Sequence, residues 1–502
     1  MFRLKNVRKY FRKNLKNFCQ STSLHGFSYI TRTDLTKTER MFWIIAIFTA
    51  IVTCVALVLA TYFWNFNIPT VTVIDSSYYP IWQVPFPAIT LCNFNKISKR
   101  KALQLLKIMR RPPNIAEPQI LNSFQMMVHY KTSRSDFHLN IELMEKVLKL
   151  NNWTLGDLRE KLMPNCLEMM MKCVWKGSEQ RCDNLFQRIP TLKGQCCSFN
   201  YYGEYKNNFP VKIHYQIPKR PYRVTGCGYT TGLTLLLDPM VDDYIAGGFS
   251  VYGFSLVIHD PYNMPDENAE TKLVTSSTEG FIRISPESTY ATESIREMDV
   301  NLRNCLFTNE RTLRIMQRYS LVNCLAECRI NYAQKKCNCV LVTENLFKDE
   351  NKTECSVREH HCLMENNEIF NKVFNDFNKT LLRIQSPSTT NFPCNCRPDC
   401  ESNHYTSELS SGKLNLKLSV NASNKKPVTY KNDNILLHAF FGDLVATRYR
   451  REIYTTELSD LANFGGILGL ITGISIVSAF EFIYYFTLRP IFNYFNNRFA
   501  DL

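Results

Sequence analysis

Residues Leu461–Leu488 read LANFGGILGLITGISIVSAFEFIYYFTL and carry one charged side chain, Glu481. An α-helix needs about 20 apolar residues to cross the hydrocarbon core of a bilayer. This stretch has 28 residues, so it is long enough to cross with some tilt. We therefore expect a transmembrane helix over 461–488.

Small residues repeat along this stretch. Gly465, Gly469 and Gly473 recur every four residues and so share one face of a helix, which Ala462 and Gly466 widen. One interpretation is a seam where helices pack closely, because small residues let helix backbones approach each other in a membrane.

The other interpretation is a pore. In Gly473-Ile474-Ser475, a helix-weakening glycine and a hydroxyl flank Ile474 in the middle of the span. Unwound backbone at that depth is tolerated only where it lines water or protein. Glu481 follows eight residues later, and a carboxylate inside a membrane marks a functional site by default. We favour the pore and keep the packing seam as the alternative.

A second apolar stretch, Met41–Tyr62, carries no charge. It is too long for the core of a signal peptide and no small-residue cleavage site follows it, so we expect a first transmembrane helix. Residues 1–40 contain ten Lys/Arg against two acids, which places this end in the cytoplasm. The expected organisation is a cytoplasmic 1–40, spans at 41–62 and 461–488, an exterior 63–460 and a cytoplasmic tail at 489–502.

The proposed exterior agrees with this topology. It holds 17 of the 19 cysteines, and dense cysteine in an oxidising compartment indicates disulfides. All four Asn-x-Ser/Thr glycosylation sequons also lie there, at Asn152, Asn351, Asn378 and Asn421. Between the spans, 48 Lys/Arg face 41 Asp/Glu, so the densest positive charge is at the N-terminus. That position favours anionic lipid over nucleic acid as the partner.

The region between the spans predicts an α+β domain. Alternation over Asn65–Tyr79 is typical of a strand, and the prolines of Pro85-Phe86-Pro87 force an extended chain. The pattern is helical over 96–170 with a break at Arg111-Pro112-Pro113, then changes to short β-rich runs over 195–300. A helical period returns over 304–330, placing Cys324 and Cys328 on one face, and apolar runs at 435–446 and 449–458 lead to the second span.

In this order the segments resemble the degenerin/epithelial sodium channel family over nearly the whole chain. Pro85-Phe86-Pro87-Ala88-Ile89-Thr90-Leu91-Cys92-Asn93 resembles the family's signature after the first span. Gly194-Gln195-Cys196-Cys197-Ser198-Phe199-Asn200 resembles a second element, with Cys197 where tyrosine is usual. Arg303-Asn304-Cys305 followed by Tyr319-Ser320 and Cys324 is most similar to the insect pickpocket branch.

The resemblance implies roles for individual residues. Gly473-Ile474-Ser475 matches the family's selectivity filter, and His25-Gly26 matches a pair before the first span implicated in gating. Ala462 falls where bulky replacements hold degenerins open, and Glu481 matches a carboxylate below the filter. Tyr484 replaces the family's second acid, which weakens the analogy for Na⁺/K⁺ selectivity. Leu302 stands where many acid-sensing members have tryptophan, so their coupling is not carried over.

The resemblance also implies disulfide pairs: Cys92–Cys196, Cys173–Cys182, Cys305–Cys400, Cys324–Cys396, Cys328–Cys394, Cys337–Cys362 and Cys339–Cys355. Cys166, Cys197 and Cys227 are left over, and one of these three must stay free or pair between chains. The cysteines of 394–400 with His360 and His361 could instead form a zinc site. Disulfides are the favoured interpretation, because free thiolates seldom persist outside the cell.

The expected fold is therefore two transmembrane helices flanking a large disulfide-rich α+β ectodomain, assembled as a trimer. The expected function, implied by the resemblance, is an amiloride-sensitive Na⁺-permeable channel subunit in the plasma membrane, gated by an unidentified stimulus or constitutively open. The alternative is an accessory or receptor-like subunit that needs related subunits to conduct. We expect no enzyme activity, cofactor or metal, since no Gly-x-Ser-x-Gly, His-Glu-x-x-His or phosphate-loop motif occurs.

Overall fold

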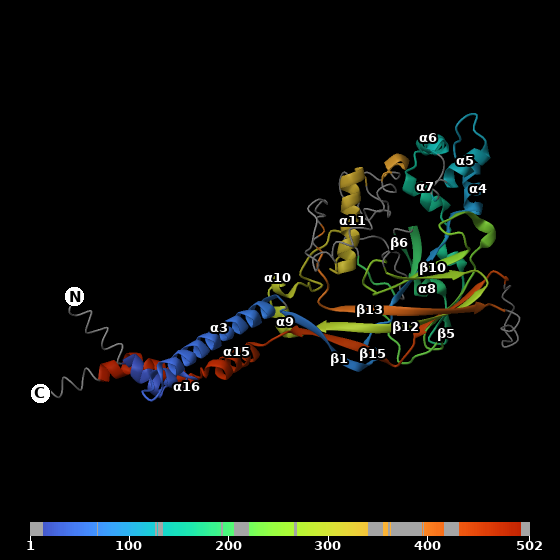
Figure 1. The fold of residues 1–502 in the computed structure, drawn as a ribbon. Helices are drawn as coiled ribbons and strands as arrows, with labels where there is room; N and C mark the ends of the chain where they lie inside the picture. The colour runs from blue at the N-terminus through green and yellow to red at the C-terminus, as the bar shows by residue number, and fades with distance from the viewer. Residues whose placement is uncertain are drawn as a thin grey trace. The chain divides into compact units, whose positions relative to one another are not determined.

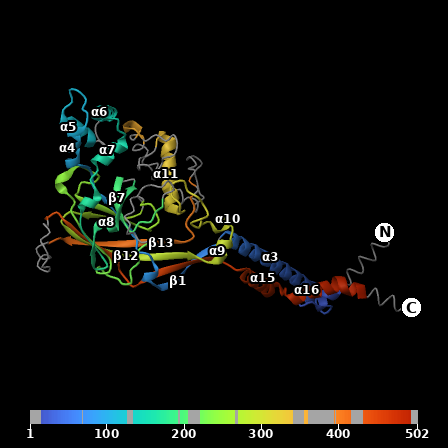
Figure 2. The same cartoon turned by 180° about the vertical axis from the view of Figure 1, so that it is seen from behind.

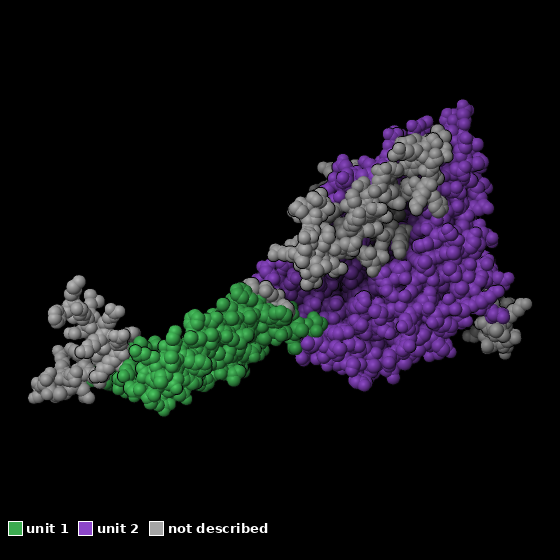
Figure 3. All heavy atoms as spheres, in the orientation of Figure 1, with its two compact units in different colours: residues 1–72, 293–298, 452–502 green, residues 73–292, 299–451 purple. Residues whose placement is uncertain are grey.

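The computed structural model describes residues 14–67, 69–125, 128, 134–191, 194–204, 220–265, 269–339, 355–359, 362, 394, 396–415 and 431–492. The chain folds into two compact units, coloured separately in Figure 3. Unit 1 joins residues 1–72, 293–298 and 452–502, and unit 2 joins residues 73–292 and 299–451. Both apolar stretches therefore belong to unit 1, although about 400 residues of chain separate them.

Unit 1 is helical (Figure 1). Its elements are a helix over 14–21, α2 (Phe27–Thr31), α3 (Lys37–Asn67), α9 (Glu293–Glu297), α15 (Glu457–Thr472), α16 (Ile476–Ile483) and a π-helical turn, η5 (Tyr484–Leu488). Thr36 and Glu39 cap α3 reciprocally, since each backbone amide donates to the other's side chain. α15 packs along α3.

Helix α3 is apolar around its circumference. Phe42, Ile45 and Phe48 are all more than half exposed in the single chain, and a helix that is hydrophobic all round requires an apolar environment. Within the described residues, α3 is the one unbroken helix long and apolar enough to cross a membrane. It runs beyond the expected 41–62 at both ends, so the strand expected from Asn65 begins only at Thr70.

The second apolar stretch is not one straight helix. α15 and the helical segment from Ile476 to Phe492 form a pair bent by 67° at a short break. The first helix also starts earlier than Leu461, at Glu457, because the Thr456 hydroxyl accepts the Ser459 amide at 3.2 Å and caps it. The expected span is thus present as two helices around Gly473–Ser475.

Unit 2 is built on β-sheets. Its strands are β1 (Thr70–Pro80, which starts in unit 1), β2 (Ala88–Asn93), β3 (Asn95–Ser98), β4 (Met170–Trp175), β5 (Ser178–Gln180), β6 (Phe186–Thr191), β7 (Gly194–Phe199), β8 (Leu233–Leu237), β9 (Tyr244–Gly247), β10 (Gly253–His259), β11 (Glu270–Thr275), β12 (Thr278–Ala291), β13 (Ser402–Lys413), β14 (Ile435–Phe441) and β15 (Val445–Ile453). The large sheet has the order β1-β15-β12-β14-β8-β4-β5, with β13 antiparallel to β12. A second sheet has the order β11-β10-β2-β7-β6, and β3 pairs with β9.

The main core of unit 2 joins residues from both large sheets. Phe86, Trp175 and Phe199 form an aromatic cluster whose ring centroids lie 4.9–6.1 Å apart, within the usual range for attractive ring pairs. β2 is buried at every position. The carbonyl of Phe86, just before β2, accepts a hydrogen bond from the Asn200 side chain at 2.5 Å, so the extended proline segment enters the core directly.

Four helices form a separate hydrophobic cluster in unit 2 (Figure 2). They are α4 (Lys99–Ile108), α5 (Glu117–Gln125), α6 (Arg134–Asn151) and α7 (Leu155–Leu162). This agrees with the expected helical region and its break near Pro112. Asn152 lies exposed between α6 and α7, and its sequon partner Thr154 caps α7. The sequons at Asn351, Asn378 and Asn421 lie outside the described residues.

Helical structure around the later cysteines is shorter than the sequence predicts. Over 299–339 the helices are α10 (Val300–Arg303) and α11 (Leu321–Cys337), and residues 304–320 are irregular. The helical prediction over 304–330 is therefore wrong in its first half. The backbone there pairs elsewhere: the Leu306 amide donates to the Pro398 carbonyl at 2.9 Å, and the Cys400 amide donates to the Leu306 carbonyl at 3.0 Å.

Unit 2 contains eight disulfides among its described residues. Seven are the pairs that the resemblance implies: Cys92–Cys196, Cys173–Cys182, Cys305–Cys400, Cys324–Cys396, Cys328–Cys394, Cys337–Cys362 and Cys339–Cys355. The eighth joins Cys166 to Cys197 and leaves Cys227 free. Cys394, Cys396 and Cys400 are consequently not available as zinc thiolates, and His360 and His361 lie outside the described residues.

A partly buried carboxylate begins α11. Asp399 accepts the Leu321 amide at 3.1 and 3.2 Å. Burial is the largest cause of a raised pKa of about 6 for Asp399. The hydrogen bond from the Leu321 amide lowers this pKa, the charge of Asp260 raises it, and Arg318 and Arg451 lower it. Burial likewise raises the pKa of Asp260. Both acids therefore resist ionisation in the folded protein.

Asp399→Asn is expected to flatten the pH dependence of stability. A raised carboxyl pKa stabilises the fold below the unfolded value of about 4, and this contribution is lost as pH rises through about 6. The melting temperature of the wild type should thus fall relative to the variant between about pH 4 and 7. Each pKa unit corresponds to roughly 1.36 kcal/mol, so the free energy of unfolding should change by about 3 kcal/mol over this pH range. The exposed Asp433→Asn variant should follow the wild type, and parallel curves for all three would contradict this role.

Candidate pore segment

The helix α15 ends where a glycine adopts a left-handed conformation. Gly473 has φ 71° and ψ 17°, and its amide donates to the Gly469 carbonyl at 3.0 Å. Glycine takes this conformation without the steric cost that other residues meet. The Ser475 amide then donates to the Ser478 hydroxyl at 2.8 Å instead of to a carbonyl one turn earlier. Carbonyls at the end of α15 therefore lose their usual helical donors.

Ser475 starts the next helix. Its hydroxyl accepts the Ser478 amide at 3.3 Å, while the Ser478 hydroxyl accepts the Ser475 amide, a reciprocal cap on α16. The sequence interpretation placed Ser475 in the filter and missed its role as a helix cap. The signal was present, because Ser475-x-x-Ser478 is a variant of the Ser/Thr-x-x-Glu/Gln capping pattern.

The His25-Gly26 pair lies against the break. The His25 amide donates to the Thr472 carbonyl at 3.1 Å. Its imidazole occupies the space beside Gly473, where an added Cβ would lie 2.7 Å from His25 Cδ2. Gly26 has φ 80° and packs near Ile47 of α3. The structure thus brings together two motifs that are about 450 residues apart in the sequence.

Glu481 contacts the segment just before His25. Its Oε2 accepts the Ser23 amide at 2.9 Å, the Thr22 hydroxyl at 3.0 Å and the Ser23 hydroxyl at 3.2 Å. The neighbouring Tyr485 hydroxyl lies 2.5 Å from that of Ser21. A carboxylate surrounded by three donors is held by charge-assisted hydrogen bonds. Glu481 therefore links the N-terminal segment to α16 by hydrogen bonds. The sequence pattern does not indicate this contact.

Aromatic rings complete this contact. The ring of Phe18 meets those of Phe482, Tyr485 and Phe486 at centroid distances of 5.5–6.0 Å. Tyr484, which stands in the place of the family's second acid, is partly exposed and packs edge-on against Tyr485 at 5.3 Å. This position after Glu481 is thus occupied by an aromatic ring and not by a carboxylate.

The small residues of α15 are open in the single chain. Ala462 is exposed, and apart from chain neighbours and the helix's own backbone no described atom lies within 4 Å of a Cβ added to Gly465 or Gly466. A Cβ on Gly469 would lie 3.8 Å from the Ile474 carbonyl oxygen. This surface is compatible with contact to lipid or to another helix. It is therefore consistent with both the pore interpretation and the packing-seam interpretation.

Glu481→Gln is expected to loosen the segment around Ser23. A hydrogen bond to a charged group contributes about 1.5–3 kcal/mol, which corresponds to roughly a 10- to 100-fold faster opening. Hydrogen exchange of the Ser23 amide should accelerate accordingly, measured by mass spectrometry on a peptide containing residues 18–26. Thr22→Val removes one hydroxyl donor without changing shape, so it should have a smaller effect. Equal exchange in Glu481→Gln and wild type would contradict the contact.

Comparison with known proteins agrees with this architecture. The model of the family described as "Amiloride-sensitive sodium channel" matches residues 18–485. "Sodium channel protein Nach" of Drosophila melanogaster is 27% identical, over 97% of this chain and 89% of that protein. "Pickpocket protein 11" of Drosophila melanogaster is 25% identical, over 95% of this chain and 76% of that protein. "Bile acid-sensitive ion channel" of Mus musculus is 23% identical, over 94% of this chain and 87% of that protein.

A solved structure of a proton-activated chloride channel matches at a TM-score of 0.25 with 7% identity, covering 88% of this chain and 95% of that one. A likeness of this size does not bear on the fold. The sequence relationships define a class of disulfide-rich membrane channel proteins. The chain belongs to the amiloride-sensitive sodium channel family, also called the degenerin/epithelial sodium channel family, and its relatives include Nach and pickpocket proteins. This is an ion channel family and not an enzyme family.

Proposed function

We propose that this chain is a subunit of a trimeric, amiloride-sensitive Na⁺ channel whose selectivity filter is Gly473-Ile474-Ser475. The observation that carries the proposal is the break between α15 and α16, where the backbone leaves helical geometry inside an apolar segment. A pore that removes water from Na⁺ must supply oxygen in its place, and a helix has already committed its carbonyls. The family membership supports the ion, the blocker and the oligomer.

The N-terminal contacts support a gating role for His25 and Gly26. His25 contacts the break itself, and Glu481 holds the preceding residues, so movement of this segment reaches the filter directly. The proposed channel thus links a cytoplasmic segment to its pore.

The direct test is expression of this chain alone under voltage clamp. An inward current that disappears on replacing external Na⁺ by N-methylglucamine, and that amiloride blocks, is the expected result. Surface protein without current, together with current on co-expression of a related subunit, would instead establish the accessory-subunit alternative. Absence of current under both conditions would contradict a conducting role.

We also propose a plasma-membrane topology with two spans and both termini in the cytoplasm. The basic N-terminus, the apolar α3 and the exposed Asn152 support it. Glycosidase should increase the electrophoretic mobility of the protein, and Asn152→Gln should remove one step of that shift. The matched control is Asn122→Gln, which changes an exposed asparagine of α5 outside any sequon and should leave the shift intact. An unchanged wild-type mobility would contradict an exterior location.

A further inference from the structure

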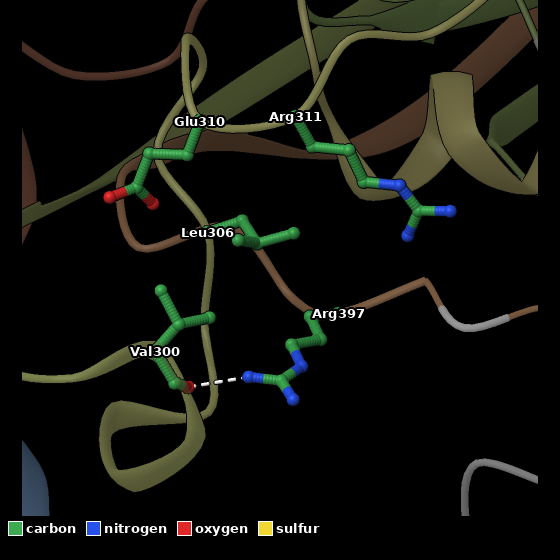
Figure 4. Close-up of a pocket in the computed structure, with 5 residues that line it drawn as sticks. All are labelled: Val300, Leu306, Glu310, Arg311 and Arg397. Atoms are coloured by element: carbon green, nitrogen blue, oxygen red, sulfur yellow. Dashed lines mark hydrogen bonds between the residues drawn. The ribbon is translucent and has the colours of Figure 1, made fainter.

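Unit 2 contains a cavity of about 550 Å³ beside α10. It is lined by Val300, Leu306, Glu310, Arg311 and Arg397 (Figure 4). This volume falls within the range of about 300–1,000 Å³ that is usual for small-molecule sites. The lining combines two aliphatic side chains with two guanidinium groups and one carboxylate, so it has both an apolar and a charged part.

The carboxylate of the cavity is already paired. Glu310 accepts from the guanidinium of Arg303, whose side chain is 1% exposed, and from the Phe307 amide at 2.8 Å. Figure 4 shows the Glu310 carboxylate on the opposite side of Leu306 from the Arg311 guanidinium. The negative charge of Glu310 is therefore balanced by the buried guanidinium of Arg303.

Arg397 donates hydrogen bonds to neutral groups. Its guanidinium donates to the Val300 carbonyl at 2.5 Å and to the Asn301 side chain at 2.8 Å. Arg311 adds a second guanidinium, which lies 6.0 Å from the Tyr319 ring centroid. Two guanidinium groups therefore line one cavity, and guanidinium is the side-chain group best matched to a carboxylate.

The cavity wall is held in place covalently. Leu306 follows Cys305, which is bonded to Cys400, and Arg397 follows Cys396, which is bonded to Cys324. The backbone bonds between Leu306 and the 398–400 segment join the two sides. A site whose groups are ordered before binding loses less entropy on taking up a ligand.

We propose that this cavity binds a small organic carboxylate with an apolar body. The carboxylate lies against Arg397 and Arg311, and the apolar body lies against Val300 and Leu306. A bare inorganic anion would leave the aliphatic wall and most of the volume unused. The site belongs to unit 2 and the proposed filter to unit 1, and they share no residue, so the site holds or fails independently of the proposed channel function.

The test is calorimetric titration of the full chain in nanodiscs with 4-phenylbutyrate, and with 4-phenylbutyramide as the neutral analogue. We expect saturable binding of the carboxylate only. Arg397→Gln should weaken it at least about ten-fold, the usual loss with a charge-assisted hydrogen bond. Arg188→Gln, an exposed arginine of β6 outside the cavity, should bind as the wild type does. No saturable heat with the wild type, or equal binding of the amide, would overturn the proposal.

A second variant separates binding from folding. Val300→Trp fills the cavity while keeping every charged group and the Val300 carbonyl that Arg397 contacts. It should abolish binding of 4-phenylbutyrate with a melting temperature near that of the wild type. Wild-type affinity in both Val300→Trp and Arg397→Gln would locate the carboxylate elsewhere and overturn the assignment.

Discussion

Gly473→Ala should abolish the Na⁺ current or change the Na⁺/K⁺ permeability ratio while the protein still reaches the cell surface. The backbone at Gly473 has φ 71°, a conformation that costs other L-residues about 1–2 kcal/mol. The new methyl group would also lie 2.7 Å from His25 Cδ2 and 3.0 Å from its Cγ, closer than carbon atoms pack. Either the break straightens or His25 leaves it, and both changes alter the proposed filter.

The packing-seam alternative predicts a different result. If Gly473 and Ser475 only let helices approach, then Gly473→Ala should reduce assembly, and Ser475→Ala should preserve selectivity. Under the pore proposal, Ser475→Ala removes a cap of about 1 kcal/mol from α16 and should change permeation with surface trimers intact. Unchanged reversal potentials and full current in both variants would refute the filter.

Two further variants make this test sharper. Gly412→Ala is a matched control, because Gly412 does not have positive φ and no described atom lies within 4 Å of its added Cβ. It should conduct normally. His25→Ala combined with Gly473→Ala removes the steric contact but not the unfavourable φ. Recovery of current in the double variant would assign the effect to the contact between the two motifs.

The sequence indicated unwound backbone at Gly473–Ser475, and the helix breaks there, between α15 and α16, from a local cause. A glycine and a serine at the end of an apolar helix provide a left-handed cap and a new N-cap within three residues. The contacts of Glu481 could not be predicted in this way. They join residues that are 458 and 459 positions apart, and such pairs leave no periodic signal in the sequence.

The cysteines illustrate the same distinction. The resemblance supplied seven pairs, but Cys197 stands where the family usually has tyrosine, so no partner was implied for it. In β7, adjacent residues point to opposite faces of the sheet. Cys196 is bonded to Cys92, and Cys197 is bonded to Cys166 in the short helix η2 (Cys166–Met169). The helical prediction was wrong over 304–320 because the backbone there forms hydrogen bonds with residues 398–400, and these long-range bonds prevail over the helical period of the sequence.

Ala462→Val should produce a constitutive current and swelling of the cells that express it. Ala462 lies one turn before Gly465 and Gly466 on α15, and this surface has no covering side chains among the described residues of the single chain. In the proposed trimer, the added methyl groups would overpack the helices where they close together. Overpacking of this kind costs about 1–3 kcal/mol. Such a cost changes a closed-to-open ratio by roughly 10- to 100-fold.

The measurement is the fraction of amiloride-blockable current present without any stimulus, divided by the amount of surface protein. Ala462→Ser keeps the volume nearly constant, so it should gate as the wild type does. Leu461→Val removes one carbon from an exposed neighbour and tests whether any substitution on this turn opens the channel. If Ala462→Val gates normally, the residue faces lipid. The crowded helix interface would then have to be sought on another face of α15.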